Sequence, residues 1–62
     1  MTARELEVLR LLASDLSGPE ISRHLSVSLN TVRTHIKSIY LKLEVSSRRA
    51  AVRRAAELGF LR

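Results

Sequence analysis

The residues best suited to chemistry gather between positions 28 and 37 of this 62-residue chain. Arg33 and Lys37 stand four residues apart, so on a helix they stack on one side. Asn30 and Thr34 lie beside them. Arginine and lysine can donate to O6 and N7 of guanine, while asparagine can read adenine or support a helix cap. We therefore expect this helix face to contact base edges, the alternative being a solvated polar face.

Hydroxyl groups mark the start of the same predicted helix. Ser28 is its expected N-cap, and Thr31 follows in the first turn. A helix start carries free amides and a partial positive charge, so it can hold a phosphate. Arg23 and Lys42 are further candidates for phosphate contact and could equally be surface charges.

The chain around these residues predicts two helices joined by a tight turn. Residues 18–25 form a short helix and residues 29–43 a longer one, with the turn at Ser26-Val27. Ser22 is small where the two helices must cross. The apolar residues expected to hold the pair together are Leu25, Val27, Val32 and Ile36. Such a frame projects one polar helix face outward.

Capping signals define the helix starts in the first third of the chain. Thr2 with Glu5 forms a capping box ahead of a helix over residues 3–14. Ser17 with Glu20 repeats the pattern ahead of the second helix. Apolar residues at helical spacing that should face the core are Leu6, Leu9, Leu12 and Ala13 in the first helix, and Val32, Ile36, Ile39, Tyr40 and Leu43 in the third.

A fourth helix is expected over residues 47–58. Ser46 or Ser47 would cap it, and Gly59 stands in the usual stop position. Apolar and polar residues nowhere alternate one by one over a length typical of a strand, so no strand is expected. The predicted fold is all-α, a four-helix helix-turn-helix domain over residues 1–62 with the third helix as the recognition helix.

Composition narrows the functional classes. The net charge is +5 and the pI about 11.2, which favours a polyanionic partner, either nucleic acid or an anionic membrane surface, over a merely basic soluble domain. With no cysteine and two histidines, neither a disulfide nor a structural zinc site is expected. The acidic residues are scattered and no glycine-rich loop is present, so we expect no enzyme and no cofactor.

No run approaches the ~20 apolar residues of a membrane span, and a signal peptide is missing, so we expect a cytoplasmic, nucleoid-associated protein.

Several motifs recur in the order and spacing of one domain type. They are Thr2-x-Arg4-Glu5-x-Glu7-Val8-Leu9, Leu16-Ser17-x-x-Glu20-Ile21, Thr31-Val32-Arg33-x-His35, Ile39-Tyr40-x-Lys42-Leu43-x-Val45, Arg48-x-x-Ala51-Val52 and Leu58-Gly59. Together they resemble the DNA-binding domain of LuxR/NarL/GerE-type bacterial transcription regulators. One such motif would be weak evidence, but the set covers nearly the whole chain.

The resemblance implies that the third helix enters the major groove of double-stranded DNA. It places Arg33, Thr34 and Lys37 at base-facing positions and Thr31 and His35 near the DNA backbone. It also implies a homodimer formed through the fourth helix and a regulatory domain N-terminal to this one. RNA polymerase is a further candidate partner of such a regulator.

Two departures from the family pattern affect these expectations. Glu44 stands where the family usually has glycine, and a left-handed glutamate would cost about 1 kcal/mol. Gly18-Pro19 replaces a polar residue and a lysine, which could remove one backbone contact. Leu41 is apolar at a position expected to be exposed.

Three alternatives stay open from the sequence. A sigma-factor region 4 domain shares the opening and the turn pattern, although a whole fourth helix suits the LuxR type better. A protein-interaction module could use the same scaffold. The fourth helix could also lie on a membrane surface, although its apolar face is weak. Its arginines, Arg48, Arg49, Arg53 and Arg54, either contact phosphates or surround a dimer seam, for which the candidates are Val52, Ala55 and Ala56.

Overall fold

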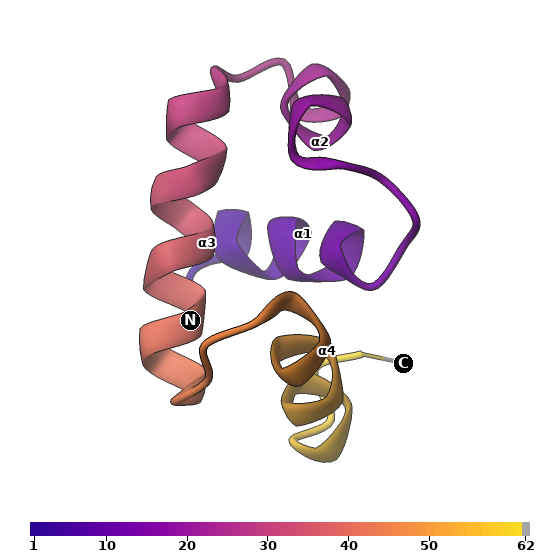
Figure 1. The fold of residues 1–62 in the computed structure, drawn as a ribbon, viewed down its shortest axis with the longest axis vertical. Helices are drawn as coiled ribbons and strands as arrows, with labels where there is room; N and C mark the ends of the chain where they lie inside the picture. The colour runs from indigo at the N-terminus through magenta and orange to yellow at the C-terminus, as the bar shows by residue number, and fades with distance from the viewer. Residues whose placement is uncertain (62) are drawn as a thin grey trace.

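Four helices form the computed structural model, which describes residues 1–61 (Figure 1). Their bounds are α1 Ala3–Leu12, α2 Gly18–Leu25, α3 Leu29–Leu43 and α4 Arg48–Glu57. Residues 1–61 contain no strand. The all-α prediction is confirmed, and the bounds of α2 and α3 agree with those expected from the sequence.

Both predicted capping boxes are present. In the first, the Thr2 amide donates to Glu5 Oε1 at 2.9 Å and the Glu5 amide donates to Thr2 Oγ1 at 3.1 Å. Ser17 and Glu20 make the same reciprocal pair at 2.9 and 3.3 Å. The hydrogen bonds from the Ser17 amide and hydroxyl lower the pKa of Glu20. Two reciprocal pairs therefore fix where α1 and α2 begin.

The bounds of the first and last helices differ from the prediction. The first helix ends at Leu12 rather than at residue 14, because Ala13 caps it and the Ser14 hydroxyl donates to the Leu11 carbonyl. A hydroxyl that satisfies a carbonyl of the last turn competes with continuation of the helix. The last helix covers residues 48–57 rather than 47–58, because Ser47 is its N-cap, accepting from the Ala50 amide at 3.1 Å, and Leu58 is its C-cap. Gly59 follows that helix with φ 80°.

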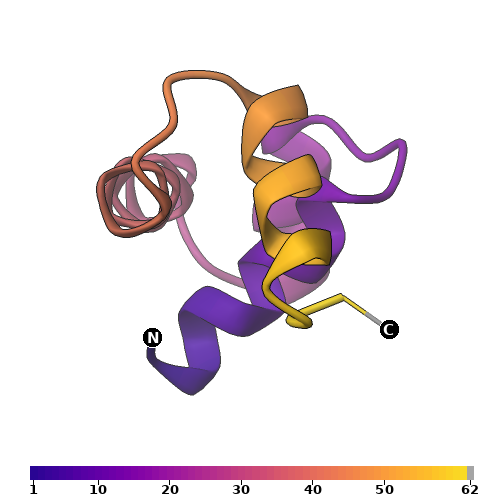
Figure 2. The ribbon, with the colours of Figure 1, turned by 90° about the horizontal axis from the view of Figure 1, so that it is seen from below.

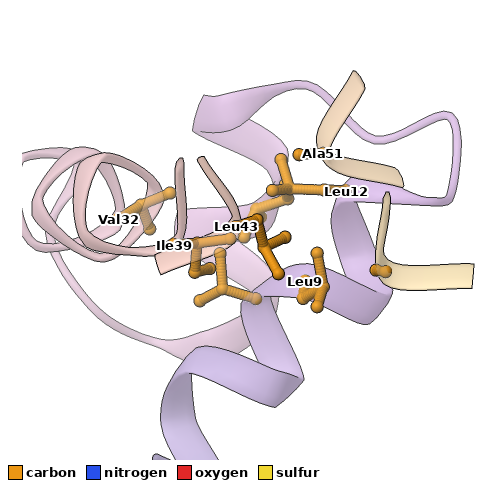
Figure 3. Packing of buried hydrophobic residues seen from close by; sticks show 9 residues of the cluster. Leu9, Leu12, Val32, Ile39, Leu43 and Ala51 are labelled. Atoms are coloured by element: carbon orange, nitrogen blue, oxygen red, sulfur yellow. The ribbon is translucent and has the colours of Figure 1, made fainter. Parts of the chain in front are cut away.

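The core lies where α3 crosses the other three helices (Figure 3). Val32, Ile39 and Leu43 project from α3 toward Leu9 and Leu12 of α1. The remaining buried apolar residues are Val8, Ile21, Ala51 and Ala55. Val8 is fully buried although the sequence analysis did not place it in the core, while the predicted core residue Ala13 is exposed and Leu6 only half-buried.

Two left-handed residues end the central helices. Ser26 has φ 57° and ψ 41°, which turns the chain from α2 to α3 and lets the Val27 amide donate to the Ser22 carbonyl at 3.0 Å. Val27 packs against the core, as expected. Glu44 has φ 57° and ψ 46°, so the glutamate at the family glycine position adopts the left-handed conformation whose cost was considered from the sequence. A sharp reversal at each site sets the direction of the next element.

The third helix stands along one edge of the molecule, and the other helices lie to one side of it (Figure 1). Figure 2 views α3 nearly end-on and shows the same separation. One face of α3 therefore packs on the core and the opposite face is directed away from the protein. No helix within residues 1–61 has the length and apolarity needed to cross a membrane.

Candidate nucleic-acid interface

The outward face of α3 carries the residues predicted to contact bases. Asn30, Arg33, Thr34 and Lys37 are all exposed. At 3.6 residues per turn their positions fall within about 100° of one another, on the side opposite the buried residues of this helix. The structure thus brings the four predicted base-facing residues together on one surface stripe.

The two cations on this stripe have no acidic neighbour. Arg33 and Lys37 take part in none of the ion pairs within residues 1–61. Residues 29–43 contain no aspartate or glutamate. Both positive charges are therefore available to an anionic or hydrogen-bond-accepting ligand.

The start of α3 is arranged as an anion-binding end. Ser28 Oγ accepts from the Thr31 amide at 3.1 Å and lies 2.8 Å from Thr31 Oγ1. Within residues 1–61 the amides of Leu29 and Asn30 have no acceptor, as expected for the first turn of a helix. These donors and the positive end of the helix dipole point toward the same space.

Three further predicted contact residues, Thr34, His35 and Arg23, differ in exposure. Thr34 Oγ1 donates to the Asn30 carbonyl at 3.0 Å, so its oxygen can only accept from a further ligand. His35 is half-buried, and Arg23 is exposed near the end of α2. Thr34 thus belongs to the stripe itself, and His35 is the least accessible of these three side chains.

Lys42 is an exposed residue that forms an ion pair with a buried carboxylate. Its Nζ lies 2.6 Å from Oε1 of Glu5, which is only 5% exposed, and Ser38 Oγ donates to the other carboxylate oxygen at 2.6 Å. The Lys42 charge is therefore neutralised within the domain. The sequence predicted only the capping role of Glu5, and it left Lys42 as either a phosphate contact or a surface charge.

This contact has an electrostatic consequence for Glu5. The hydrogen bonds from Lys42, then from Ser38 and from the Thr2 amide, lower the pKa of the Glu5 carboxyl from 4.5 to about 2. The carboxylate is thus held in its charged form between α1 and α3. Its hydrogen bonds to Ser38 and Lys42 join the start of α1 to α3.

Arg48 is a second residue whose role the sequence did not show. Its Nε donates to the Leu12 carbonyl at 2.9 Å, and its Nη2 donates to the Ser14 and Leu16 carbonyls at 2.9 and 2.6 Å. These acceptors belong to the C-terminal end of α1 and the loop after it, where a cation is favourable. Arg48 therefore joins α4 to α1, which leaves it outside both roles considered for the arginines of this helix.

The remaining α4 residues divide by exposure. Arg49 and Arg53 are exposed and line an open groove with Asp15, while Arg54 lies 3.6 Å from Glu57. Among the predicted dimer-seam residues, Ala56 is exposed and Val52 half-buried. Ala55 is fully buried in the core, so its place in the predicted seam was wrong.

Comparison with known proteins decides the family. A family described as bacterial regulatory proteins, luxR family, matches residues 1–55. This chain belongs to the luxR family. A LuxR-family structure, the transcription factor GerE, superposes with a TM-score of 0.92 at 42% identity, covering 100% of this chain and 92% of that chain.

Family membership confirms the resemblance drawn from the motifs. The chain is a DNA-binding transcription-regulator domain of the LuxR type with a helix-turn-helix fold. The family is one of DNA-binding regulators and not of enzymes. The sigma-factor region 4 alternative is accordingly set aside.

Proposed function

We propose that this LuxR-type domain reads double-stranded DNA by placing α3 in the major groove. The observation that supports this is the outward stripe of α3, where Arg33 and Lys37 are exposed, free of acidic partners and directed away from the core. An α-helix fits the major groove, and both side chains can donate to guanine. Asn30 and Thr34 complete the base-facing set.

Phosphate contacts would come from the start and the flank of this helix. Ser28 and Thr31 border the free amides of the first turn, which suit a phosphate oxygen. His35 and Arg23 are the further backbone candidates. Lys42 is left out of this set because Glu5 holds its ammonium group.

The family relationship also supports proposals about assembly. We infer a homodimer on DNA, with the half-buried Val52 and the exposed Ala56 of α4 as seam residues. We also infer that the domain is the C-terminal module of a longer cytoplasmic, nucleoid-associated regulator that can meet RNA polymerase. A small seam of this kind would favour dimers on DNA over dimers in free solution.

Substitutions on the stripe test the base-contact proposal. Arg33→Ala and Lys37→Ala should each weaken binding to a selected operator duplex by about 1–3 kcal/mol, because each removes a donor to a base. The affinity of each variant for a random-sequence duplex should fall by less than its affinity for the operator. Fluorescence anisotropy measures both, with Arg10→Ala as the matched control, since Arg10 is an exposed arginine on α1.

The same titration reports the assembly. Two domains per duplex are expected on a site with two half-sites, and one on a single half-site. Operator binding that survives both stripe substitutions unchanged would contradict the base-facing assignment. One domain per two-half-site duplex at saturation would contradict the proposed homodimer.

A further inference from the structure

Leu41 is an apolar side chain on the otherwise polar outward stripe of α3. It is 73% exposed, and the only other large hydrophobic residues exposed within residues 1–61, Met1 and Leu58, lie outside this helix. It follows Lys37 by four residues and Thr34 by seven, so it continues the same helix face. The stripe therefore ends in a leucine at its C-terminal side.

The length of the stripe fits the groove in which we place α3. Arg33 and Leu41 are eight residues apart, which corresponds to about 12 Å along a helix. The major groove, about 12 Å wide, admits an α-helix, which can run along it for several turns. A helix that brings Arg33 to base edges can therefore keep Leu41 within the same groove.

The chemistry of leucine restricts what it can contact there. It has no donor or acceptor and cannot bind a phosphate. On the base edges of the major groove the apolar group is the 5-methyl of thymine. Lys42, the next residue, is held on the flank of α3 by Glu5, so its ammonium group is not drawn to this position.

We propose that Leu41 is a specificity-determining residue that contacts a thymine methyl group at the end of the recognised half-site. The proposal rests on the proposed placement of α3 in the major groove. It adds an apolar determinant to the polar ones at Asn30, Arg33 and Lys37. It also gives the operator a chemical feature, a thymine at the position reached by the last exposed turn of the helix.

A coupled substitution of protein and DNA tests this. A duplex site is first selected from random sequence with the unmodified domain, and each thymine is then replaced singly by deoxyuridine, which lacks only the methyl group. At one thymine the unmodified domain should lose about fourfold in affinity, the value for one methylene-sized apolar group. Leu41→Ala should bind the unmodified site about fourfold more weakly and respond to that replacement by less than twofold.

A control variant and the stripe variants separate the outcomes. Leu58→Ala removes an exposed leucine from the end of α4, and this variant should lose as much affinity on deoxyuridine replacement as the unmodified domain does. Thermal unfolding checks that Leu41→Ala is folded. If Arg33→Ala weakens operator binding but Leu41→Ala responds to every deoxyuridine like the unmodified domain, the Leu41 proposal alone is wrong, and the leucine is left to a protein contact. If the unmodified domain selects no site, the placement of α3 and the Leu41 proposal both fail.

Discussion

Glu5 joins the beginning of α1 to the middle of α3 through a buried carboxylate. It accepts from the Thr2 amide, from Ser38 and from Lys42, so each oxygen has a partner. Removing one partner of a buried charged group lowers the free energy of unfolding more than removing an exposed ion pair does. This single residue therefore couples the start of the domain to the orientation of its recognition helix.

The lowered pKa of Glu5 predicts how acid affects stability. The unfolded chain binds a proton near pH 4.5 and the folded domain only near pH 2. The stabilisation by Glu5 is therefore complete above about pH 4.5 and is lost as the pH falls from there toward 2. Denaturant unfolding at pH 6 and pH 3 should show a smaller loss of stability for Glu5→Gln than for the unmodified domain.

The control for this experiment is Glu7→Gln. Glu7 is an exposed carboxylate on the same helix, 3.7 Å from Arg4. The Glu7→Gln variant should lose as much stability between pH 6 and pH 3 as the unmodified domain does. An unchanged acid response in Glu5→Gln would show that the network at Glu5 does not contribute to stability in this way.

The sequence predicted contacts within one helical turn better than contacts between residues far apart in the chain. The capping role of Glu5 follows from its spacing to Thr2, because both lie within one helical turn. Its contacts to Ser38 and Lys42 bridge 33 and 37 residues, and Arg48 reaches the α1 carbonyls across 36. No local spacing encodes such contacts, so these two roles could be found only in the folded structure.

At the scale of the element, the recognition helix is defined by its two ends. Ser28 caps its start, and the left-handed Glu44 ends it, so that the Val45 amide can donate to the Tyr40 carbonyl at 2.9 Å. Both ends were predicted, because a cap and a family glycine position are local signals. The end of α1 was misjudged, since apolar spacing continues to Ala13 while the Ser14 hydroxyl bonds the last turn.

Glu44 makes a prediction about helix stability. A glutamate in the left-handed region is strained, and its charge lies at the negative end of the helix dipole. Glu44→Gly should stabilise the domain by about 0.5–1 kcal/mol in thermal or denaturant unfolding. Glu44→Ala separates the two causes, because it removes the charge and keeps the left-handed strain. Destabilisation by glycine would mean that the glutamate side chain contributes more than its backbone conformation costs.

The whole molecule divides along α3 into a core side and an exposed polar side. The three other helices lie to one side of α3 (Figure 1). The opposite face holds Arg33 and Lys37, which form no ion pair within residues 1–61. The net charge of +5 gives the domain a general attraction to a polyanion. The sequence predicted this division from helical periodicity, but not which basic residues were already engaged. Lys42 and Arg48 are used inside the domain, whereas Arg33 and Lys37 are not.

The most direct test of base reading by α3 is a titration of the domain with duplex DNA at two salt concentrations, followed by amide chemical shifts residue by residue. We expect shifts centred on Thr31 to Lys37, with binding that weakens on adding salt by a log–log slope of about −0.9 for each phosphate contact. Shifts confined to α4 at low salt, with the fold intact, would contradict the placement of α3 in the groove.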